Sequence, residues 1–228
     1  MVAPEIPKLR PVFGVGSLDT SQRDPSATWD CRGWRLQKEA HVFLFQYGSN
    51  MDQERLEERI ADPEFDRFVP DDVPRRAELK GAAYLVGWRF DLGGHNADQK
   101  RVCDIRPVGG NAVMWGALWD LHPSLVVRPD GQRSLFDRIE GYRRGGKSAW
   151  DIYRRIPVEV CFEAEPCQAW TYVCTPEARR CLRGCRHVAD PCYTKHVLRG
   201  AAALALPDDY QAFLDNGCGE AQVGQIER

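Results

Sequence analysis

The sequence lacks both a strong net charge and any long apolar segment. Its 31 Lys and Arg residues nearly balance 33 Asp and Glu residues, which leaves a formal charge of −2 over 228 residues. A chain so close to neutrality has no bulk attraction for nucleic acid or for an anionic membrane surface. No stretch approaches the roughly 20 apolar residues that cross a bilayer. We therefore predict a protein without nucleic-acid or membrane partners.

The N-terminal segment MVAPEIPKLRPVFGVG has no apolar core followed by a small-residue cleavage site, so we expect no secretory signal. The chain contains nine cysteines, an odd number. Without a secretory signal, this count indicates reduced thiols and a cytoplasmic location.

Six of the cysteines fall in the stretch 161–192, where a zinc site is the alternative to simple packing. Structural zinc sites use short paired Cys-x-x-Cys or His-x-x-x-His knuckles. Here three residues separate Cys181 from Cys185, and His187, Cys192 and His196 form no defined second pair. The spacing favours packed or surface thiols. We predict no metal.

Composition divides the chain into three parts. Residues 1–40 are rich in Pro, Gly, Asp, Arg and Ser and show little periodicity, which predicts an extended arm. Trp29 and Trp34 could make this arm a partner-binding segment. Residues 41–216 carry the periodic elements and form the predicted domain, and residues 217–228 form a C-terminal tail.

Six strands are predicted from aromatic and β-branched runs bounded by glycine or proline; they span 42–47, 77–92, 101–108, 112–121, 150–162 and 168–174. The Gly109-Gly110-Asn111 sequence predicts a hairpin turn between the third and fourth strands. Helices are predicted at 51–60, 135–141, 193–204 and 208–214, the first with Ser49 or Asn50 as its N-cap. This order predicts an α+β fold with a mixed, mostly antiparallel, six-stranded barrel-like sheet surrounded by helices.

Three separated motifs stand out in this framework: YGSNM after the first strand, FDRIEGY before a later strand, and DPCYTKHVLRGAAALALPDDYQAFL near the end. Together with GWRFDLGG and MWGALWDL, this ordered set resembles the γ-glutamylcyclotransferase family over residues 41–216. Residues 13–18 imitate the first motif. They lack its tyrosine, a preceding strand and a following amphipathic helix, so we assign the motif to residues 47–50.

The resemblance implies a cofactor-independent enzyme that forms 5-oxoproline, as in glutathione metabolism. The α-amine of a γ-glutamyl unit attacks its own γ-carbonyl and releases an amine or an amino acid. The resemblance places the general acid/base on Glu140 and substrate contacts on Leu44, Phe45, Gln46, Tyr47, Gly48, Ser49 and Tyr193.

The residue types suit these roles. A buried carboxyl can have a raised pKa and can exchange protons with an amine. A turn built on Gly48 lets a ligand approach backbone N–H groups closely.

Several alternatives stay open from the sequence. The leaving group could be an amino acid, an amine or a γ-glutamyl-tagged metabolite. The same fold could instead serve as a non-catalytic module that binds a γ-glutamyl compound or another small metabolite. The oligomeric state is also open, with a homodimer among the options.

Overall fold

The computed structural model describes residues 42–95, 100–127, 133–141, 152–180 and 191–219. All of them belong to one unit of the chain, Glu39–Arg228. The predicted arm at 1–40, the imitating motif at 13–18 and most of the predicted tail lie outside the described residues, as do Cys181, Cys185 and His187. Within the described residues, no helix is long and apolar enough to cross a membrane.

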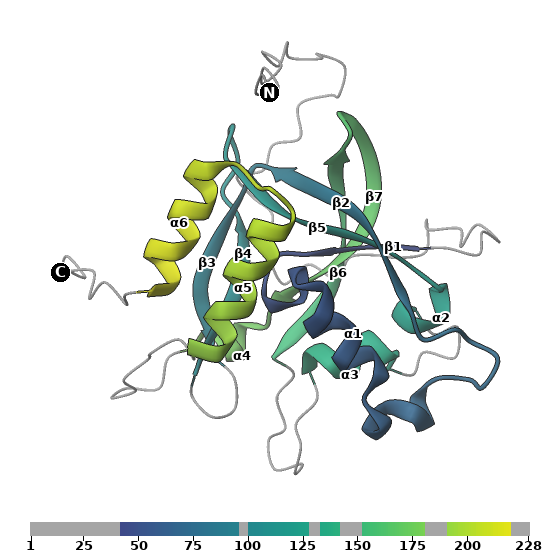
Figure 1. Ribbon diagram of the computed structural model, residues 1–228. Helices are drawn as coiled ribbons and strands as arrows, with labels where there is room; N and C mark the ends of the chain where they lie inside the picture. The colour runs from purple at the N-terminus through teal and green to yellow at the C-terminus, as the bar shows by residue number, and fades with distance from the viewer. Residues whose placement is uncertain (1–41, 96–99, 128–132, 142–151, 181–190, 220–228) are drawn as a thin grey trace. The chain divides into compact units, whose positions relative to one another are not determined.

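A closed five-stranded barrel forms the centre of this unit (Figure 1). The strands follow the order β1-β5-β2-β6-β7; their bounds are β1 Val42–Gln46, β2 Ala77–Val86, β5 Val113–Leu121, β6 Tyr153–Phe162 and β7 Glu165–Cys174. β1 pairs antiparallel with β5 and parallel with β7, so the sheet is mixed. The predicted α+β class with a barrel-like sheet is confirmed, although the number of strands differs.

The difference lies in a second, two-stranded sheet made by β3 (Trp88–His95) and β4 (Arg101–Pro107). The strand predicted at 77–92 is divided at Gly87, whose φ of 78° few other residues adopt. The hairpin predicted at 109–111 is wrong, because β4 and β5 belong to different sheets. The Gly109 amide instead donates to the Gly87 carbonyl at 3.0 Å. Both strands of one long antiparallel ribbon therefore bend at the same place, and seven strands replace the predicted six.

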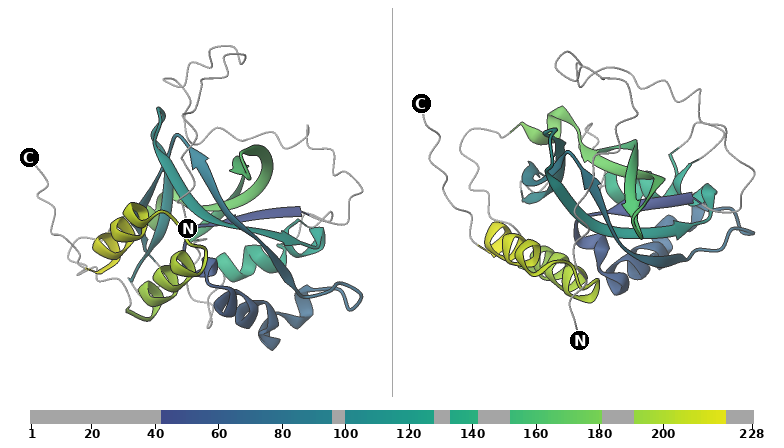
Figure 2. Two further views of the ribbon diagram at one scale, coloured as in Figure 1. Left: turned by 45° about the horizontal axis from the view of Figure 1, so that its top comes forward. Right: turned by 90° about the horizontal axis from the view of Figure 1, so that it is seen from above.

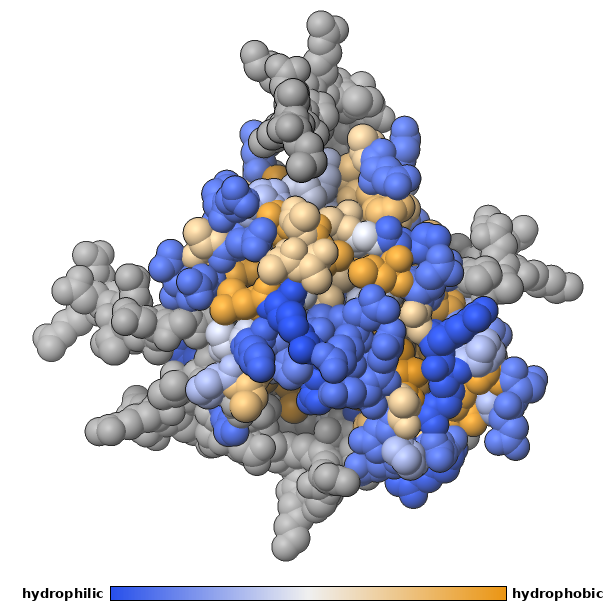
Figure 3. All heavy atoms as spheres, viewed as in Figure 1, coloured by the Kyte–Doolittle hydropathy of each residue, from blue (hydrophilic) through white to orange (hydrophobic). Residues whose placement is uncertain are grey.

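Helices surround these sheets, and Figures 1 and 2 show α5 and α6 side by side near β3. Their bounds are η3 Ser49–Met51, α1 Gln53–Ala61, η4 Pro63–Phe68, α2 Pro123–Val126, α3 Leu135–Gly141, α4 Pro176–Arg179, α5 Pro191–Ala203 and α6 Asp208–Gly219. Helix α1 buries Leu56 and Ile60, four residues apart, which confirms the predicted amphipathic pattern. Its outward surface, and that of the neighbouring part of α5, is hydrophilic in Figure 3. The core includes Phe45, Trp119 and Phe136, none of which has exposed surface.

Candidate active site

The turn after β1 folds inward rather than capping a helix. Ser49 and Asn50 are buried within the short η3 turn, and the N-cap of α1 is Asp52. The predicted N-cap at Ser49 or Asn50 is therefore wrong. The reason is tertiary packing, because α5 lies directly on η3. A Cβ at Gly200 of α5 would come within 2.6 Å of the Asp52 backbone nitrogen.

Gly48 brings the turn into close contact with Tyr193 of α5. A Cβ at Gly48 would lie 2.9 Å from the Tyr193 hydroxyl oxygen, which is closer than non-bonded carbon and oxygen atoms tolerate. That hydroxyl accepts a hydrogen bond from the Cys103 backbone N–H at 3.1 Å. The structure thus places Tyr193 against the predicted loop, although 144 positions separate Tyr193 from Ser49 in the chain.

Glu140, in the last turn of α3, points its carboxyl at the same turn. Asn50 Nδ2 donates to Glu140 Oε1 at 2.6 Å, and Gln46 Nε2 donates to the same oxygen at 3.4 Å. Arg59 of α1 supports the arrangement by donating to Asn50 Oδ1 at 2.9 Å and to the backbone carbonyl of Ile139. A single network therefore joins β1, η3, α1 and α3.

Burial raises the pKa of the Glu140 carboxyl above its ordinary value. The charge of Arg59 and the hydrogen bonds from Asn50 and Gln46 act in the opposite direction but are outweighed. A carboxyl that holds its proton to higher pH is better matched to proton exchange near neutrality. The environment therefore equips Glu140 for general acid/base work.

A cavity of about 220 Å³ lies between these groups. Its lining contains six of the eight predicted site residues: Gln46, Tyr47, Gly48, Ser49, Glu140 and Tyr193. Leu44 and Phe45 do not line it. Both side chains have no exposed surface and pack in the hydrophobic core, so the substrate contact expected of them has no support in the geometry.

The cavity also contains residues that the sequence analysis missed: Asn50, Arg55, Arg59, Val102, Cys103, Ile139, Ile152, Tyr153 and Tyr172. Arg55 and Arg59 were detectable, because residues four apart on a helix that begins beside the loop share one face. The contributions of Tyr153 and Tyr172 depend on how β6 and β7 close the barrel, for which the sequence has no local pattern.

Tyrosines form much of the cavity wall and stay neutral. Tyr47 donates its hydroxyl to the Tyr172 carbonyl at 2.6 Å, and Tyr153 donates to the Cys103 carbonyl. Burial raises the pKa of all four phenols, Tyr47, Tyr153, Tyr172 and Tyr193, well above the ordinary value. Among the described residues, no group of three or more His, Cys, Asp or Glu side chains could hold a metal ion.

The barrel, its bent two-stranded extension and the covering helices define a γ-glutamylcyclotransferase-like fold. A solved γ-glutamyl cyclotransferase matches with a TM-score of 0.55 and 20% identity, over 82% of this chain and 94% of that chain. YkqA from Bacillus subtilis matches with a TM-score of 0.54 and 21% identity, over 80% of this chain and 55% of YkqA. An uncharacterized protein from Homo sapiens matches with a TM-score of 0.52 and 21% identity, over 78% of this chain and 88% of the human protein.

Sequence comparison adds nothing to these structural matches. No family model matches the chain, and neither does any curated protein. The likeness at about 20% identity establishes the fold alone.

Proposed function

We propose that this protein is a cofactor-independent γ-glutamylcyclotransferase with Glu140 as its general acid/base. One observation carries the proposal: the Glu140 carboxyl shares a single cavity with the Gln46–Ser49 segment and is hydrogen-bonded to its neighbour Asn50 at 2.6 Å. A carboxyl with a raised pKa, enclosed beside a glycine turn, suits proton transfer at a small polar substrate.

The reaction is an intramolecular acyl transfer. The α-amine nitrogen of the γ-glutamyl unit attacks the γ-carbonyl carbon, and the carbonyl electron pair moves onto oxygen. The Glu140 carboxylate accepts the proton lost by the attacking nitrogen. It then returns this proton to the leaving nitrogen as the original carbon–nitrogen bond breaks, which yields 5-oxoproline and a free amine. Atoms and charge balance without any co-reactant.

The turn at Gly48 is assigned to binding and to stabilising the oxyanion. Gly48 and Ser49 line the cavity, so the backbone N–H groups of the turn are available to donate to the substrate carbonyl. Gln46, Tyr47 and Ser49 line the same side of the cavity, and Tyr193 closes it from α5. A folded γ-glutamyl chain held between these walls has its amine and γ-carbonyl close enough to react.

The test is 5-oxoproline release from γ-glutamyl-alanine and from glutathione. The unsubstituted protein should form product. Glu140→Gln and Glu140→Ala should reduce kcat about 10²–10⁴-fold, the range for loss of a general acid/base. Glu159→Gln is the matched control, because Glu159 is exposed on β6 and lies outside the cavity lining.

Full activity in Glu140→Gln would mean that another residue acts as the general acid/base. A protein that forms no product from either substrate, yet binds a γ-glutamyl compound, would instead be a binding module on the same fold.

A further inference from the structure

The cavity lining carries more positive than negative charge among the described residues. It contains two guanidinium groups, Arg55 and Arg59, and one carboxyl, Glu140. The lining tyrosines remain neutral because burial raises the pKa of each phenol. Even with Glu140 ionised, the two cations outnumber the single carboxylate. Such a cavity is complementary to a ligand with an excess of negative charge.

The two arginines have different surroundings. Arg59 is held by pocket groups, since it donates to Asn50 Oδ1 at 2.9 Å and to the Ile139 carbonyl. Its charge also lowers the pKa of Glu140 against the larger effect of burial. Arg59 therefore belongs to the reacting centre, where it orients Asn50 toward Glu140.

Arg55 lies one helical turn before Arg59 on the same face of α1, a displacement of about 6 Å along the helix axis. Its guanidinium bonds to Glu58 at 3.3 Å, and the exposed fractions of the two side chains are 40% and 58%. Exposed ion pairs of this kind contribute little to the stability of the fold. Glu58 is not among the cavity-lining residues, so a carboxylate inside the cavity could engage Arg55 at small cost.

We propose that Arg55 binds a carboxylate on the leaving group, so that the protein acts on γ-glutamyl amino acids or peptides rather than on γ-glutamyl amines. The inference rests on the proposed function. The α-carboxylate of the γ-glutamyl unit sits on the carbon that bears the attacking amine, and so lies beside Glu140 and Arg59. A leaving amino acid carries its carboxylate away from the forming ring, toward the second cation. The intact γ-glutamyl amino acid carries a net charge of minus one, which also matches the excess of cations in the cavity.

The test compares γ-glutamyl-alanine with γ-glutamyl-ethylamide, which differs by loss of the leaving-group carboxylate. The unsubstituted protein should prefer γ-glutamyl-alanine by about tenfold or more in kcat/KM, as expected for a hydrogen bond between charged groups. Arg55→Ala should raise KM for γ-glutamyl-alanine about tenfold and should change KM for the ethylamide much less, because the ethylamide has no leaving-group carboxylate for Arg55 to bind. Arg55→Lys should keep part of the preference, since it retains the charge but not the planar fork.

Arg67→Ala is the control for loss of a surface arginine, because Arg67 is exposed on η4 and lies outside the cavity lining. It should keep the full preference for γ-glutamyl-alanine. Equal losses on both substrates in Arg55→Ala, or no preference in the unsubstituted protein, would overturn the inference while the cyclotransferase activity stands. Absence of 5-oxoproline from both substrates would overturn the proposed function, and the inference with it.

Discussion

At the scale of single residues, the pKa of Glu140 results from two opposing influences. Burial disfavours the carboxylate, whereas Arg59, Asn50 and Gln46 favour it, and burial prevails. The folded-state pKa is therefore above the ordinary value of 4.5. A group with a raised folded-state pKa contributes its full stability below the ordinary pKa, and this contribution is lost as the pH rises through the folded-state pKa.

Glu140→Gln should accordingly become more stable relative to the unsubstituted protein as the pH rises. The neutral amide resembles the protonated carboxyl in shape and avoids the cost of a buried charge. Thermal melts at several pH values from 4 upward would measure the difference in Tm. A difference that moves in the opposite direction with rising pH would mean that the network stabilises the carboxylate more than burial opposes it.

Gly48 provides a second prediction at this scale. Its φ of −109° lies outside the left-handed region that favours glycine, so the space around Gly48 is what a substitution tests. Gly48→Ala places a methyl group against the Tyr193 hydroxyl and should destabilise the fold by about 1–3 kcal/mol, as overpacking does.

Tyr193→Phe removes the clashing oxygen, so Gly48→Ala should cost much less in the Tyr193→Phe variant than in the unsubstituted protein, measured by urea denaturation. If Gly48→Ala costs as much in the Tyr193→Phe variant as in the unsubstituted protein, the close approach of the turn to Tyr193 is not the cause.

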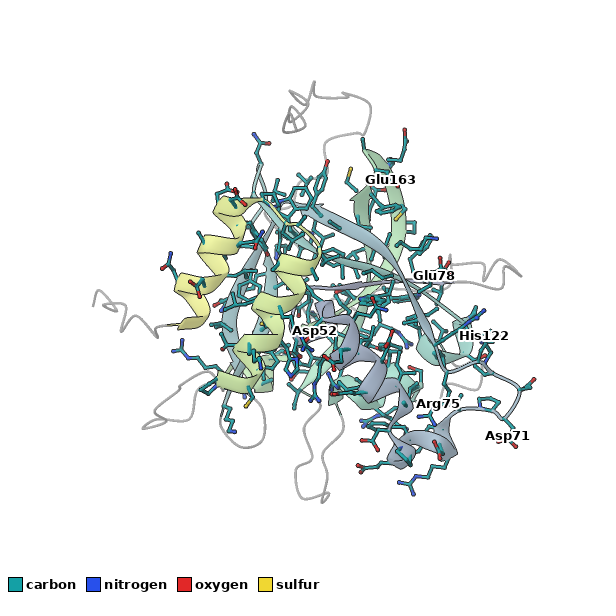
Figure 4. All side chains as sticks on the ribbon, in the orientation of Figure 1. Asp52, Asp71, Arg75, Glu78, His122 and Glu163 are labelled. Carbon is teal, nitrogen blue, oxygen red and sulfur yellow. The ribbon has the colours of Figure 1, made fainter. Side chains whose placement is uncertain are left out.

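At the scale of elements, Asp52 fastens α5 to the start of α1, and Figure 4 shows Asp52 where these two helices approach. Its side chain is 5% exposed; Oδ2 lies 2.6 Å from His196 Nδ1 and accepts from Arg199 Nε at 2.6 Å. Burial raises the Asp52 pKa, but the bonds from His196 and Arg199 outweigh it and lower the pKa below 3.8. Because α5 carries Tyr193, this contact helps to hold one wall of the cavity in place.

Asp52→Asn should lower the free energy of unfolding by about 1–3 kcal/mol at pH 7, because His196 and Arg199 lose a charged acceptor. A lowered folded-state pKa gives stability that is present above pH 3.8 and lost as the pH falls through the folded-state value. The difference from the unsubstituted protein should therefore shrink in acid.

Glu54→Gln is the control, since Glu54 pairs with the same Arg199 at 2.7 Å but is 69% exposed. It should change stability little. If the two substitutions lowered the free energy of unfolding equally, the burial of Asp52 would add nothing to its pairing with Arg199.

Much of the fold could be predicted because the patterns are local. The strand ending at Gln46, the helix with Leu56 and Ile60, and the short helix carrying Glu140 each have their own periodicity or boundary residue. The turn at Gly109 was mistaken for a hairpin, because Gly87 and Gly109 meet only through the pairing of distant strands. The role of Asn50 was missed for a similar reason: as a local signal it resembles a cap, and only α5 packing on η3 turns it inward.

At the scale of the whole molecule, closure of the barrel decides where the turn meets Glu140. Strand β1 is short and lies between β5 and β7, and its pairing with β7 aligns Leu44 with Trp170. Next to that point, buried Thr171 donates its hydroxyl to the Phe45 carbonyl at 2.9 Å. On the other side of β1, Gly116 allows β5 to approach closely, since a Cβ at Gly116 would lie 2.4 Å from the Gln46 carbonyl oxygen.

Thr171→Val should cost about 1–2 kcal/mol in the free energy of unfolding, because it removes a buried donor without changing the side-chain shape. It should also lower activity, since β1 leads directly into the Gly48 turn. Thr171→Ser keeps the hydroxyl and should retain most of the activity. If the valine variant is fully active, the position of the turn does not depend on this side of the barrel.

The most direct test of the role assigned to Glu140 is a crystal structure of Glu140→Gln with 5-oxoproline bound. The ring should occupy the cavity beside Gly48, with its carbonyl toward the backbone of the turn and its nitrogen toward residue 140. A ring bound at any other place, or one whose nitrogen points away from residue 140, would contradict the assignment of that residue to the proton transfers.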